Sequence, residues 1–396
     1  KRRVSWFRRI NLIRGLDMLS VTELPHYQIS VATGFVPSTD PIDHLPKHYE
    51  PWEAIMAQMG GLLMNGRLRA AVAHLPHLSI THLESGAELQ RAMLLLSVIG
   101  NGYVWGGSEP AAVLPAQIAV PWCELAEKLG RPPIVAHQTM VLNNWQRLDK
   151  TAPVTLDNVT TQALFLGGMD ERWFYLVTLQ IELDGAAALP TLIAAQTAVA
   201  QEQPEGLIPS LQTISATIEK MLASLERMME KCDPYIFYHR VRPFLAGWPE
   251  PGLIYEGVNT MPQLLAGGSA AQSSLIQALD VGLGVVHTSP KTRPFLEEMR
   301  AYMPRPHRAF LRALEAGPNV AEFVNNHRES HPQLVQAYND CIAQLDTFRR
   351  KHIEISVRYI VHQAPESEAA KGTGGTSFVP FLSEARKETK RQIMAS

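Results

Sequence analysis

The sequence contains few cysteines, and it lacks any arrangement of them that would bind a metal or form a disulfide framework. Its three cysteines, Cys123, Cys232 and Cys341, are far apart and follow no metal-ligand spacing. An odd number of cysteines is also a poor basis for paired disulfides. Because reduced cysteines are typical of reducing compartments, we expect a cytoplasmic protein.

The sequence also lacks an excess of either charge and any long apolar run. Lysine and arginine number 36 and aspartate and glutamate 38, so the formal net charge of the 396 residues is −2. This balance gives no reason to expect a nucleic-acid surface. No run of about 18 or more apolar residues occurs, so we expect no membrane-spanning helix. With 46% hydrophobic residues, the chain is long enough for one large core or two domains.

A third absence is the alternation of polar and apolar residues that half-buried β-strands produce. Residues 134–142 are the only tempting strand, and they fit a helix equally well. Residues 88–105 are apolar on most sides, as in a buried helix. Residues 209–231 predict an amphipathic helix, with apolar side chains three or four positions apart at Leu211, Ile214, Ile218, Met221, Leu225 and Met228. We therefore expect an all-α, mainly helical fold.

Proline-rich turns interrupt the first third of the chain and distinguish it from the rest. We expect a smaller, more irregular N-terminal domain over residues 1–160 and a larger helical domain over residues 161–396, joined near residues 147–158. The first 14 residues carry basic charge and no acid. A basic amphipathic helix or a transit-like segment would fit them, but we favour a flexible extension over residues 1–20.

The longest predicted helix lies late in the chain, between residues 331 and 364. It has one buried stripe, formed by Leu334, Ala337, Cys341, Leu345, Phe348, His352, Ile355 and Tyr359. A histidine in such a stripe needs partners for its ring nitrogens. From periodicity alone, a core histidine bonded to a neighbouring carbonyl is the favoured interpretation. The alternative is axial ligation of a haem iron, which would be non-covalently bound because the sequence has no CxxCH motif.

Two aromatic clusters could each form part of a pocket. The first, within residues 171–185, contains Phe174, Tyr175 and Thr178 on a nearly all-apolar helix, a pattern more often found in a core. The second contains Phe237 and Arg242, which are five apart and therefore lie on adjoining faces of an α-helix. An arginine beside aromatic rings suits a carboxylate, although a surface arginine is the simpler interpretation.

Two glycine-containing stretches follow. Residues 264–284 place two glycines before a helix that starts near Ser269, which suits a flat ligand or a close contact between helices. Asp280, in the same helix, is a candidate buried partner for a cation. The stretch KGTGGTSF, residues 371–378, has no preceding strand and no Lys-Ser or Lys-Thr pair after its glycines, so it is not a Walker A loop. It fits a backbone nest for a carboxylate or a disordered tail segment.

Taken together and in this order, these stretches resemble the indoleamine 2,3-dioxygenase family, as a bacterial-type member. The resemblance covers most of the chain from about residue 100 onward, while the first 40 residues match poorly. Each segment alone is weak, but the combination is specific. The stretches are PPIVAHQTMVLNNW, WFYLVTLQIE, FYHRVRPFLAGW, LIYEGV, LLAGGSAAQSSLIQALDVGLG, FLEEMRAYMPRPHRAFLRALE, LDTFRRKHIEISVRYI and AKGTGGTSF.

The resemblance implies a two-domain helical fold in which the large domain binds a non-covalent haem b and the small domain caps it. His352 matches the axial ligand of the haem iron. The implied haem-side residues are Arg349, Asp280, Ser269 and Ala270. The implied distal-pocket residues are Phe174, Thr178, Phe237 and Arg242, with Arg242 on the substrate carboxylate. The implied mobile loop carries Gly372, Thr373 and Gly374, and Thr373 or a neighbour contacts the amino-acid part of the substrate.

The sequence departs from the better-known members of the family at several distal positions. Tyr175 and Tyr238 stand where a phenylalanine is expected, His137 replaces a tyrosine and Met140 replaces a cysteine. Thr178 stands in place of a serine. Each change adds or moves polarity or volume beside the substrate ring. His137 is therefore a candidate hydrogen-bond partner for the indole N–H or for O2.

The resemblance implies a haem-dependent oxidoreductase with an Fe(II) active form. The enzyme adds both atoms of O2 across the indole C2–C3 bond and needs no side-chain acid or base. L-tryptophan is the leading substrate and N-formylkynurenine, of the kynurenine pathway, the product. The alternatives are a protein of the same fold acting on another indole or aromatic, a haem or gas-binding protein with little turnover, and a helical scaffold without haem. A small-molecule substrate is the expected partner, without nucleic acid or membrane, and the protein is a monomer or a dimer.

Overall fold

The computed structural model describes residues 18–365, 372–374 and 377–395, and these residues are mainly helical. The all-α prediction is confirmed. The first 17 residues, which hold most of the predicted extension, lie outside the described residues. The strands form two short pairs: β1 (Val113–Leu114) runs parallel to β4 (Ile254–Tyr255), and β2 (Gln146–Arg147) runs antiparallel to β3 (Val159–Thr160).

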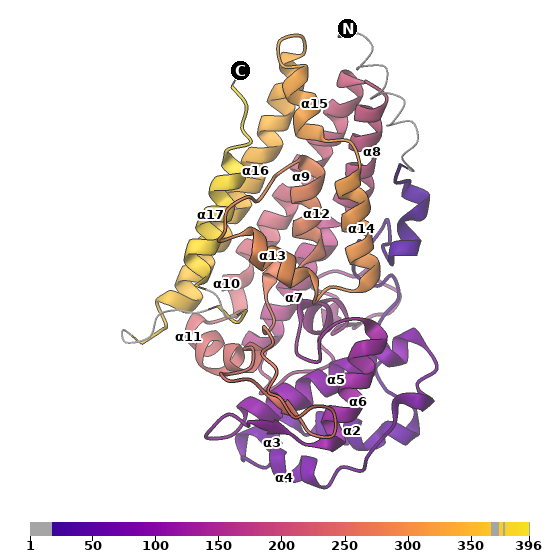
Figure 1. Cartoon of the computed structure of the whole chain (residues 1–396), viewed down its shortest axis with the longest axis vertical. Coiled ribbons are helices and arrows are strands. Elements are labelled where there is room, and N and C mark those ends of the chain that lie inside the picture. The colour runs from indigo at the N-terminus through magenta and orange to yellow at the C-terminus, as the bar shows by residue number, and fades with distance from the viewer. Residues whose placement is uncertain (1–17, 366–371, 375–376, 396) are drawn as a thin grey trace.

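A bundle of long helices forms the upper part of the molecule (Figure 1). α16 (Pro332–Ser356) packs along α9 (Pro204–Glu226), and α9 packs on α7 (Met169–Asp184) and α8 (Ala188–Ala200). α12 (Ser274–Leu283) lies between α8 and α14 (Arg305–Ala316), and α17 (Phe378–Lys390) packs on α16. The predicted amphipathic helix is α9 continued by α10 (Met228–Lys231), and its apolar stripe is buried in the bundle as expected.

A second group of helices lies below the bundle and contains α2 (Glu50–Ala57), α3 (Met59–Met64), α4 (Leu68–Ala73), α5 (Gly86–Trp105) and α6 (Ala116–Leu129). α5 is its buried centre, as its all-round apolar sequence predicts, and a capping box of Ser85 and Glu88 starts it. α6 crosses α5 at Gly100, where a Cβ atom would lie 2.2 Å from the Trp122 ring. Only glycine permits this approach.

The remaining elements are short and connect or cover these two groups. They are η1 (Val21–Tyr27), η2 (Lys47–Tyr49), η3 (Ile80–His82), η4 (Gln138–Leu142), η5 (Gly185–Ala187), α11 (Pro234–Ile236), η6 (Phe237–Val241), η7 (Arg242–Leu245), η8 (Ala270–Gln272), α13 (Arg293–Arg300), α15 (Val320–Asn326) and η9 (Val357–Val361). Three of them, η4, η6 and η9, are single π-helical turns. The tempting strand at 134–142 therefore contains a helical turn.

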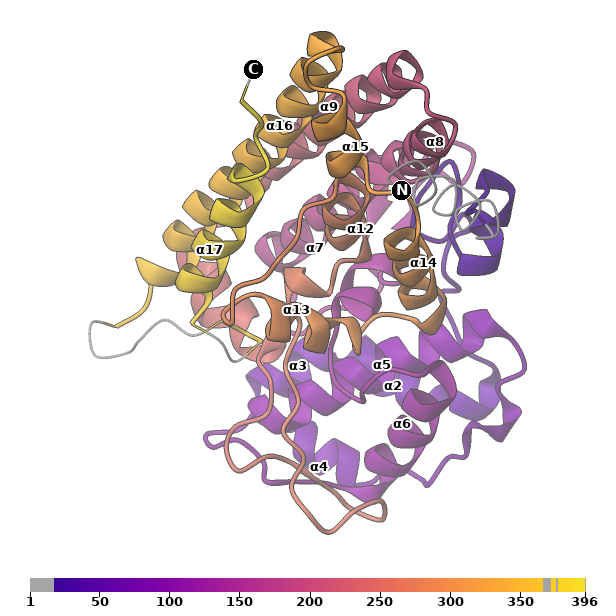
Figure 2. The ribbon, with the colours of Figure 1, turned by 45° about the horizontal axis from the view of Figure 1, so that its top comes forward.

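The chain passes between the two groups more than once. η1 packs on α8 and α14 of the bundle, although it belongs to the first third of the chain. After Leu245 the chain runs down over the lower group, where β4 pairs with β1, and it returns to the bundle at Gly268 (Figure 2). The division at residue 160 stays a prediction, since these crossings tie both groups to segments from the other side of that boundary.

The continuous helical run Met169–Ala200 is long and apolar enough to cross a membrane by length and composition. However, 56% of its most apolar window is buried inside the structure. This burial accords with a core helix that packs on α9 and α12 rather than on lipid. The expected absence of a membrane-spanning helix stays a prediction.

Candidate functional site

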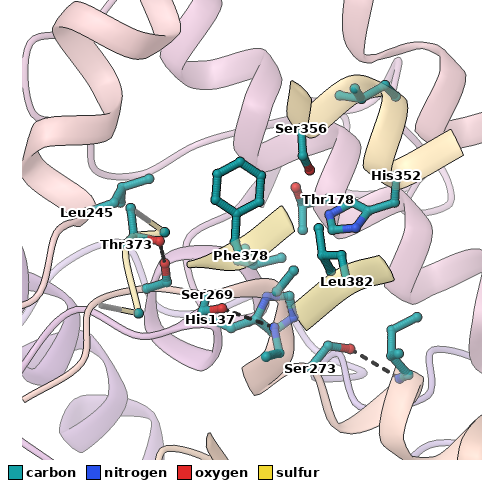
Figure 3. A pocket seen from close by; sticks show the side chains of 18 of the residues that line it. His137, Thr178, Leu245, Ser269, Ser273, His352, Ser356, Thr373, Phe378 and Leu382 are labelled. Atoms are coloured by element: carbon teal, nitrogen blue, oxygen red, sulfur yellow. Dashed lines mark hydrogen bonds between the residues drawn. The ribbon is translucent and has the colours of Figure 1, made fainter. Parts of the chain in front are cut away.

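A cavity of about 300 Å³ lies inside the bundle, and mostly apolar side chains line it (Figure 3). Its walls include residues of η4, α7, η6, η7, α12, α13, α16, η9, α17 and the segments 268–271 and 372–374. The cavity brings together fifteen of the sequence-predicted site residues: His137, Met140, Phe174, Tyr175, Thr178, Phe237, Arg242, Ser269, Ala270, Asp280, Arg349, His352, Gly372, Thr373 and Gly374.

Tyr238 is the predicted site residue that does not line this cavity. Its half-buried ring instead makes a cation–π contact with Arg242, whose guanidinium carbon lies 5.3 Å from the ring centroid. Phe237 and Arg242 both line the cavity. The π-helical turn η6 brings them closer to one face than an α-helix would, since the Arg242 N–H donates to the Phe237 carbonyl five positions earlier.

His352 extends into the cavity from near the C-terminal end of α16, about one turn before Ser356. Among the described residues, its ring nitrogens have no hydrogen-bond partner, so the core-histidine interpretation lacks the carbonyl that it requires. Burial, and then the nearby Arg349 charge, lower the pKa of His352 to about 4. The imidazole is therefore neutral near pH 7, which leaves a nitrogen lone pair for a metal.

The side chains of this cavity suit a metal that is already bound in a macrocycle better than a bare metal ion. Among the described residues there is no group of three or more His, Cys, Asp or Glu side chains that could hold a metal ion. A haem iron needs only one or two protein ligands because the macrocycle supplies the other four. One unpartnered, neutral imidazole facing a mostly apolar cavity therefore fits haem. Gly268 adds space, since nothing lies within 4 Å of where its Cβ would be.

A buried network of charges begins at Arg349, one turn before His352. The Arg349 guanidinium donates to Asp280, and His287 bonds to the second Asp280 oxygen at 3.1 Å. Burial alone would raise the pKa of Asp280, but the charge of Arg349 and the His287 hydrogen bond outweigh it and hold that pKa below its usual range. The predicted role of Asp280 as a partner for a buried cation accords with this geometry.

The network continues to two residues that the sequence analysis missed. His287, in the loop after α12, bonds through Nδ1 to Glu388 of α17 at 2.8 Å. Glu388 also accepts the backbone N–H groups of Thr288 and Ser289 and the Thr292 hydroxyl. No periodicity marks these residues, because His287 and Glu388 are 101 positions apart. The only available signal was that a buried Asp280 needs cationic partners.

Glu182 on α7 is a third residue that was missed. Its Oε1 lies 2.8 Å from His137 Nε2 and accepts the Ser273 hydroxyl at 2.6 Å. The sequence held a signal for this residue. Tyr175, Thr178 and Glu182 are three and four positions apart, so a helix places the Glu182 carboxylate on the same face as the two predicted pocket residues. His137 is therefore fixed from behind by a carboxylate while it lines the cavity.

Two hydroxyl groups in the cavity wall differ in their hydrogen bonding. Thr178 donates to the Phe174 carbonyl at 2.7 Å, one turn earlier in α7. The Tyr175 hydroxyl is buried and has no partner among the described residues. Burial, and then the Glu171 charge, raise the pKa of Tyr175 well above its usual value, so this hydroxyl stays protonated.

Thr373 connects the glycine-rich stretch to the cavity wall. Its carbonyl accepts the N–H groups of Gly247 and Gly267, both at 3.1 Å, and its hydroxyl donates to the Gly268 carbonyl at 2.5 Å. Gly372 and Gly374 line the cavity on either side. The other predicted residues of this loop, Lys371, Gly375 and Thr376, lie outside the described residues.

The chain is similar to known proteins over almost its whole length. Residues 23–392 match a family model described as "Indoleamine 2,3-dioxygenase", so the similarity begins earlier than the motif stretches suggested. The chain is 38% identical to indoleamine 2,3-dioxygenase 1 of Rattus norvegicus, covering 94% of this chain and 96% of that protein. It is 35% identical to indoleamine 2,3-dioxygenase of Saccharomyces cerevisiae, covering 96% and 95%. It is 33% identical to 6-hydroxytryptophan 2,3-dioxygenase fscD of Fusarium equiseti, covering 95% and 99%.

Proposed function

The chain belongs to the indoleamine 2,3-dioxygenase family, and from this membership we propose how its own residues serve the reaction. The protein is a haem-dependent dioxygenase that adds both atoms of O2 across the C2–C3 bond of tryptophan or a related indole. Haem, when bound, supplies the redox chemistry of O2. The single observation that carries the finer proposal is the unpartnered His352 imidazole in a mostly apolar cavity.

The proposed cofactor is haem b, non-covalently bound and active as Fe(II), with His352 as the axial ligand. The neutral imidazole and the absence of CxxCH support this assignment. Arg349 and Asp280 would hold α16 and α12 together on the side of the cavity that carries His352, since Arg349 lies one turn before His352 and bonds to Asp280. Ser269 and Ala270 would lie against the macrocycle edge because small side chains permit close approach.

The proposed substrate is L-tryptophan, held between the aromatic wall and a carboxylate-binding arginine. The rings of Phe174 and Phe237 lie 4.7 Å apart between centroids and would hold an indole in one orientation. Arg242 would bind the substrate carboxylate, which a planar guanidinium can hold through two parallel hydrogen bonds. Thr373 would contact the amino-acid part of the substrate. These residues orient the reactants and exclude water, which is the protein's main contribution to such a reaction.

His137 would accept a hydrogen bond from the indole N–H. An ionised Glu182 can only accept, so the His137 Nε2 atom donates to it. In the tautomer that carries its proton on Nε2, the lone pair lies on Nδ1, which suits an N–H donor better than O2. Methylating the indole nitrogen of tryptophan should weaken binding to the native enzyme, and this penalty should shrink in His137→Phe. An equal penalty in both proteins would contradict the assignment.

A second candidate substrate is an indole with a polar ring substituent. The observation that favours it is the buried Tyr175 hydroxyl without a partner, because a ring hydroxyl on the substrate would satisfy it. A relative covering 95% of this chain is named as a 6-hydroxytryptophan dioxygenase. Comparing kcat/KM for tryptophan and hydroxytryptophans would separate the two candidates.

The cellular setting is part of the same proposal. We place the protein in the cytoplasm because Cys123, Cys232 and Cys341 are all free thiols, which suits a reducing compartment. We expect a small-molecule substrate, since a formal net charge of −2 gives no reason to propose a nucleic-acid or membrane partner, and this charge neither demands nor excludes a dimer.

A single-turnover measurement tests the function. The protein is reconstituted with haem, reduced, mixed with L-tryptophan and then with O2, while the haem spectrum and N-formylkynurenine are followed together. We expect stoichiometric N-formylkynurenine within one turnover. Normal haem and O2 spectra without product would overturn tryptophan as the substrate, and the absence of a Soret band would overturn the haem site itself.

A further inference from the structure

The imidazole of His287 connects two carboxylates that belong to different helices. Its Nε2 lies 3.1 Å from Asp280 of α12, and its Nδ1 lies 2.8 Å from Glu388 of α17. All three side chains are buried, with 9%, 6% and 2% of their side-chain surfaces exposed for His287, Asp280 and Glu388. The ring therefore joins the cavity-lining Asp280 to the last turn of α17.

Both ring nitrogens of His287 must carry a proton to satisfy this geometry. An ionised carboxylate can only accept a hydrogen bond, so each nitrogen that faces one must donate. A neutral imidazole has one N–H and leaves one carboxylate facing a lone pair. The charged groups that face the ring are Asp280, Glu388 and, across Asp280, Arg349. With an imidazolium, this group of four has zero net charge, and deprotonation leaves it at −1 in a buried site.

The electrostatics favour the protonated ring. Burial alone would lower the pKa of His287, but the Asp280 hydrogen bond and charge outweigh it, so the pKa is raised above its usual value. A group whose pKa is raised in the folded state stabilises that state below its unfolded pKa. That stabilisation is lost as the pH rises from the pKa of the unfolded state through the pKa of the folded state.

We propose that His287 is a positioning residue that fastens α17 to α12 through its two hydrogen bonds to Glu388 and Asp280. Phe378, Phe381 and Leu382 of α17 line the cavity, so fastening this helix sets one wall of the substrate site. The same bond to Asp280 holds the carboxylate that Arg349 needs. The inference rests on the proposed function only in treating this cavity as the substrate site.

Amide hydrogen exchange in α17 tests the proposal in the haem-loaded, full-length protein. The opening constant of α17 is obtained at each pH by dividing the observed exchange rate by the intrinsic rate at that pH. We expect this constant to rise by up to about tenfold per pH unit above about 6.5, until the folded pKa of His287 is reached. In His287→Gln, which carries no charge at any pH, the constant should be flat.

Two further variants control the experiment. His331→Gln removes a histidine that lies 3.2 Å from Glu205 on the surface and away from the cavity, so it should keep the native pH profile. Glu388→Gln keeps the side-chain volume and removes one of the two carboxylates, so the rise should end at a lower pH and be smaller. It also keeps the test decisive if His287→Gln does not fold.

A native protein whose α17 opening constant is flat with pH would overturn the proposal. A rise that persists unchanged in both His287→Gln and Glu388→Gln would overturn it as well, since another group would then be titrating. The exchange measurement needs no turnover. Failure of product formation in the native enzyme therefore counts against the proposed function alone, and failure of the pH profile counts against the role of His287 alone.

Discussion

At the scale of single residues, buried tyrosine hydroxyls differ in whether the protein supplies them with hydrogen-bond partners. The Tyr175 hydroxyl is buried without a partner among the described residues. The Tyr255 hydroxyl is also buried, but it donates to the Pro133 carbonyl at 2.7 Å and accepts the Trp248 N–H at 2.8 Å. An unsatisfied buried hydroxyl opposes folding, whereas a satisfied one supports it.

Tyr175→Phe should therefore leave the substrate-free protein equally stable or more stable, by up to about 2 kcal/mol in the free energy of unfolding. Tyr255→Phe, the matched control, should destabilise it by about 1–3 kcal/mol because two partners lose their bond. Urea unfolding monitored by circular dichroism measures both values. A clear loss of stability in Tyr175→Phe would mean that the hydroxyl has a partner after all.

His352→Ala should abolish stable haem retention, because the cavity offers no second imidazole on α16 to replace the axial ligand. The measurement is the haem-to-protein ratio after gel filtration, read from the Soret and protein absorbances. His362→Ala, which removes an exposed histidine beyond η9, is the control and should retain haem. Unchanged haem content in His352→Ala would contradict the axial assignment.

Arg242→Ala should raise KM for L-tryptophan by about ten- to a hundredfold, since a charge-assisted hydrogen-bonded pair is worth about 1.5–3 kcal/mol. KM for tryptamine, which has no carboxylate, should change little. Arg240→Ala removes an exposed arginine two positions earlier and serves as the control. Steady-state kinetics with both substrates provide the comparison. An equal rise for tryptamine would show that Arg242 shapes the cavity rather than binding the carboxylate.

At the scale of the elements, the lower group is joined by a buried ion pair between α2 and α5. Arg91 donates to both oxygens of Glu53 at 3.0 and 2.6 Å, and both side chains are almost fully buried. Glu53 also accepts the Leu45 N–H at 2.9 Å. Removing one member of such a pair leaves the other charge buried without compensation.

Glu53→Ala should therefore lower the free energy of unfolding by about 3–5 kcal/mol. Glu297→Ala is a matched control, because it breaks the exposed pair of Arg293 and Glu297 within α13 and should cost less than about 0.5 kcal/mol. Urea denaturation of both variants gives the difference. A similar small effect for the two would mean that the buried pair is dispensable.

The elements also show which parts of the site could be predicted from sequence. The apolar stripe of α16 gave the position of His352 because helical periodicity is a local signal. The α-helical period does not describe the stretch from Phe237 to Arg242, and nothing in the local sequence indicates its π-helical turn. The pairing of His137 with Glu182 and of His287 with Glu388 could not be predicted, because these residues are 45 and 101 positions apart and are brought together only by tertiary packing.

At the scale of the whole molecule, contacts across the two helical groups are polar as well as apolar. The side-chain amide of Asn101, on α5, donates to the backbone carbonyl of Phe244. The oxygen of the same amide accepts the Val135 N–H. The rings of Phe165 and Phe244 stack 4.9 Å apart. Arg305 of α14 donates to the Glu127 carbonyl at the end of α6. Such connections, together with the chain crossings, favour cooperative unfolding of both groups, whichever residue divides them.

This cooperativity is testable through the Glu53→Ala variant, whose altered residue lies in the lower group while the proposed haem ligand lies in the bundle. If the two groups unfold as one unit, the urea midpoint for loss of the Soret band should move with the midpoint for loss of far-ultraviolet circular dichroism, by the same amount. If they unfold separately, the Soret midpoint should stay at its native value while part of the circular dichroism is lost earlier. Because anything that binds only the folded state stabilises it by mass action, both midpoints must be compared at one haem concentration. A shared shift would mean that the lower group supports haem binding through cooperative folding.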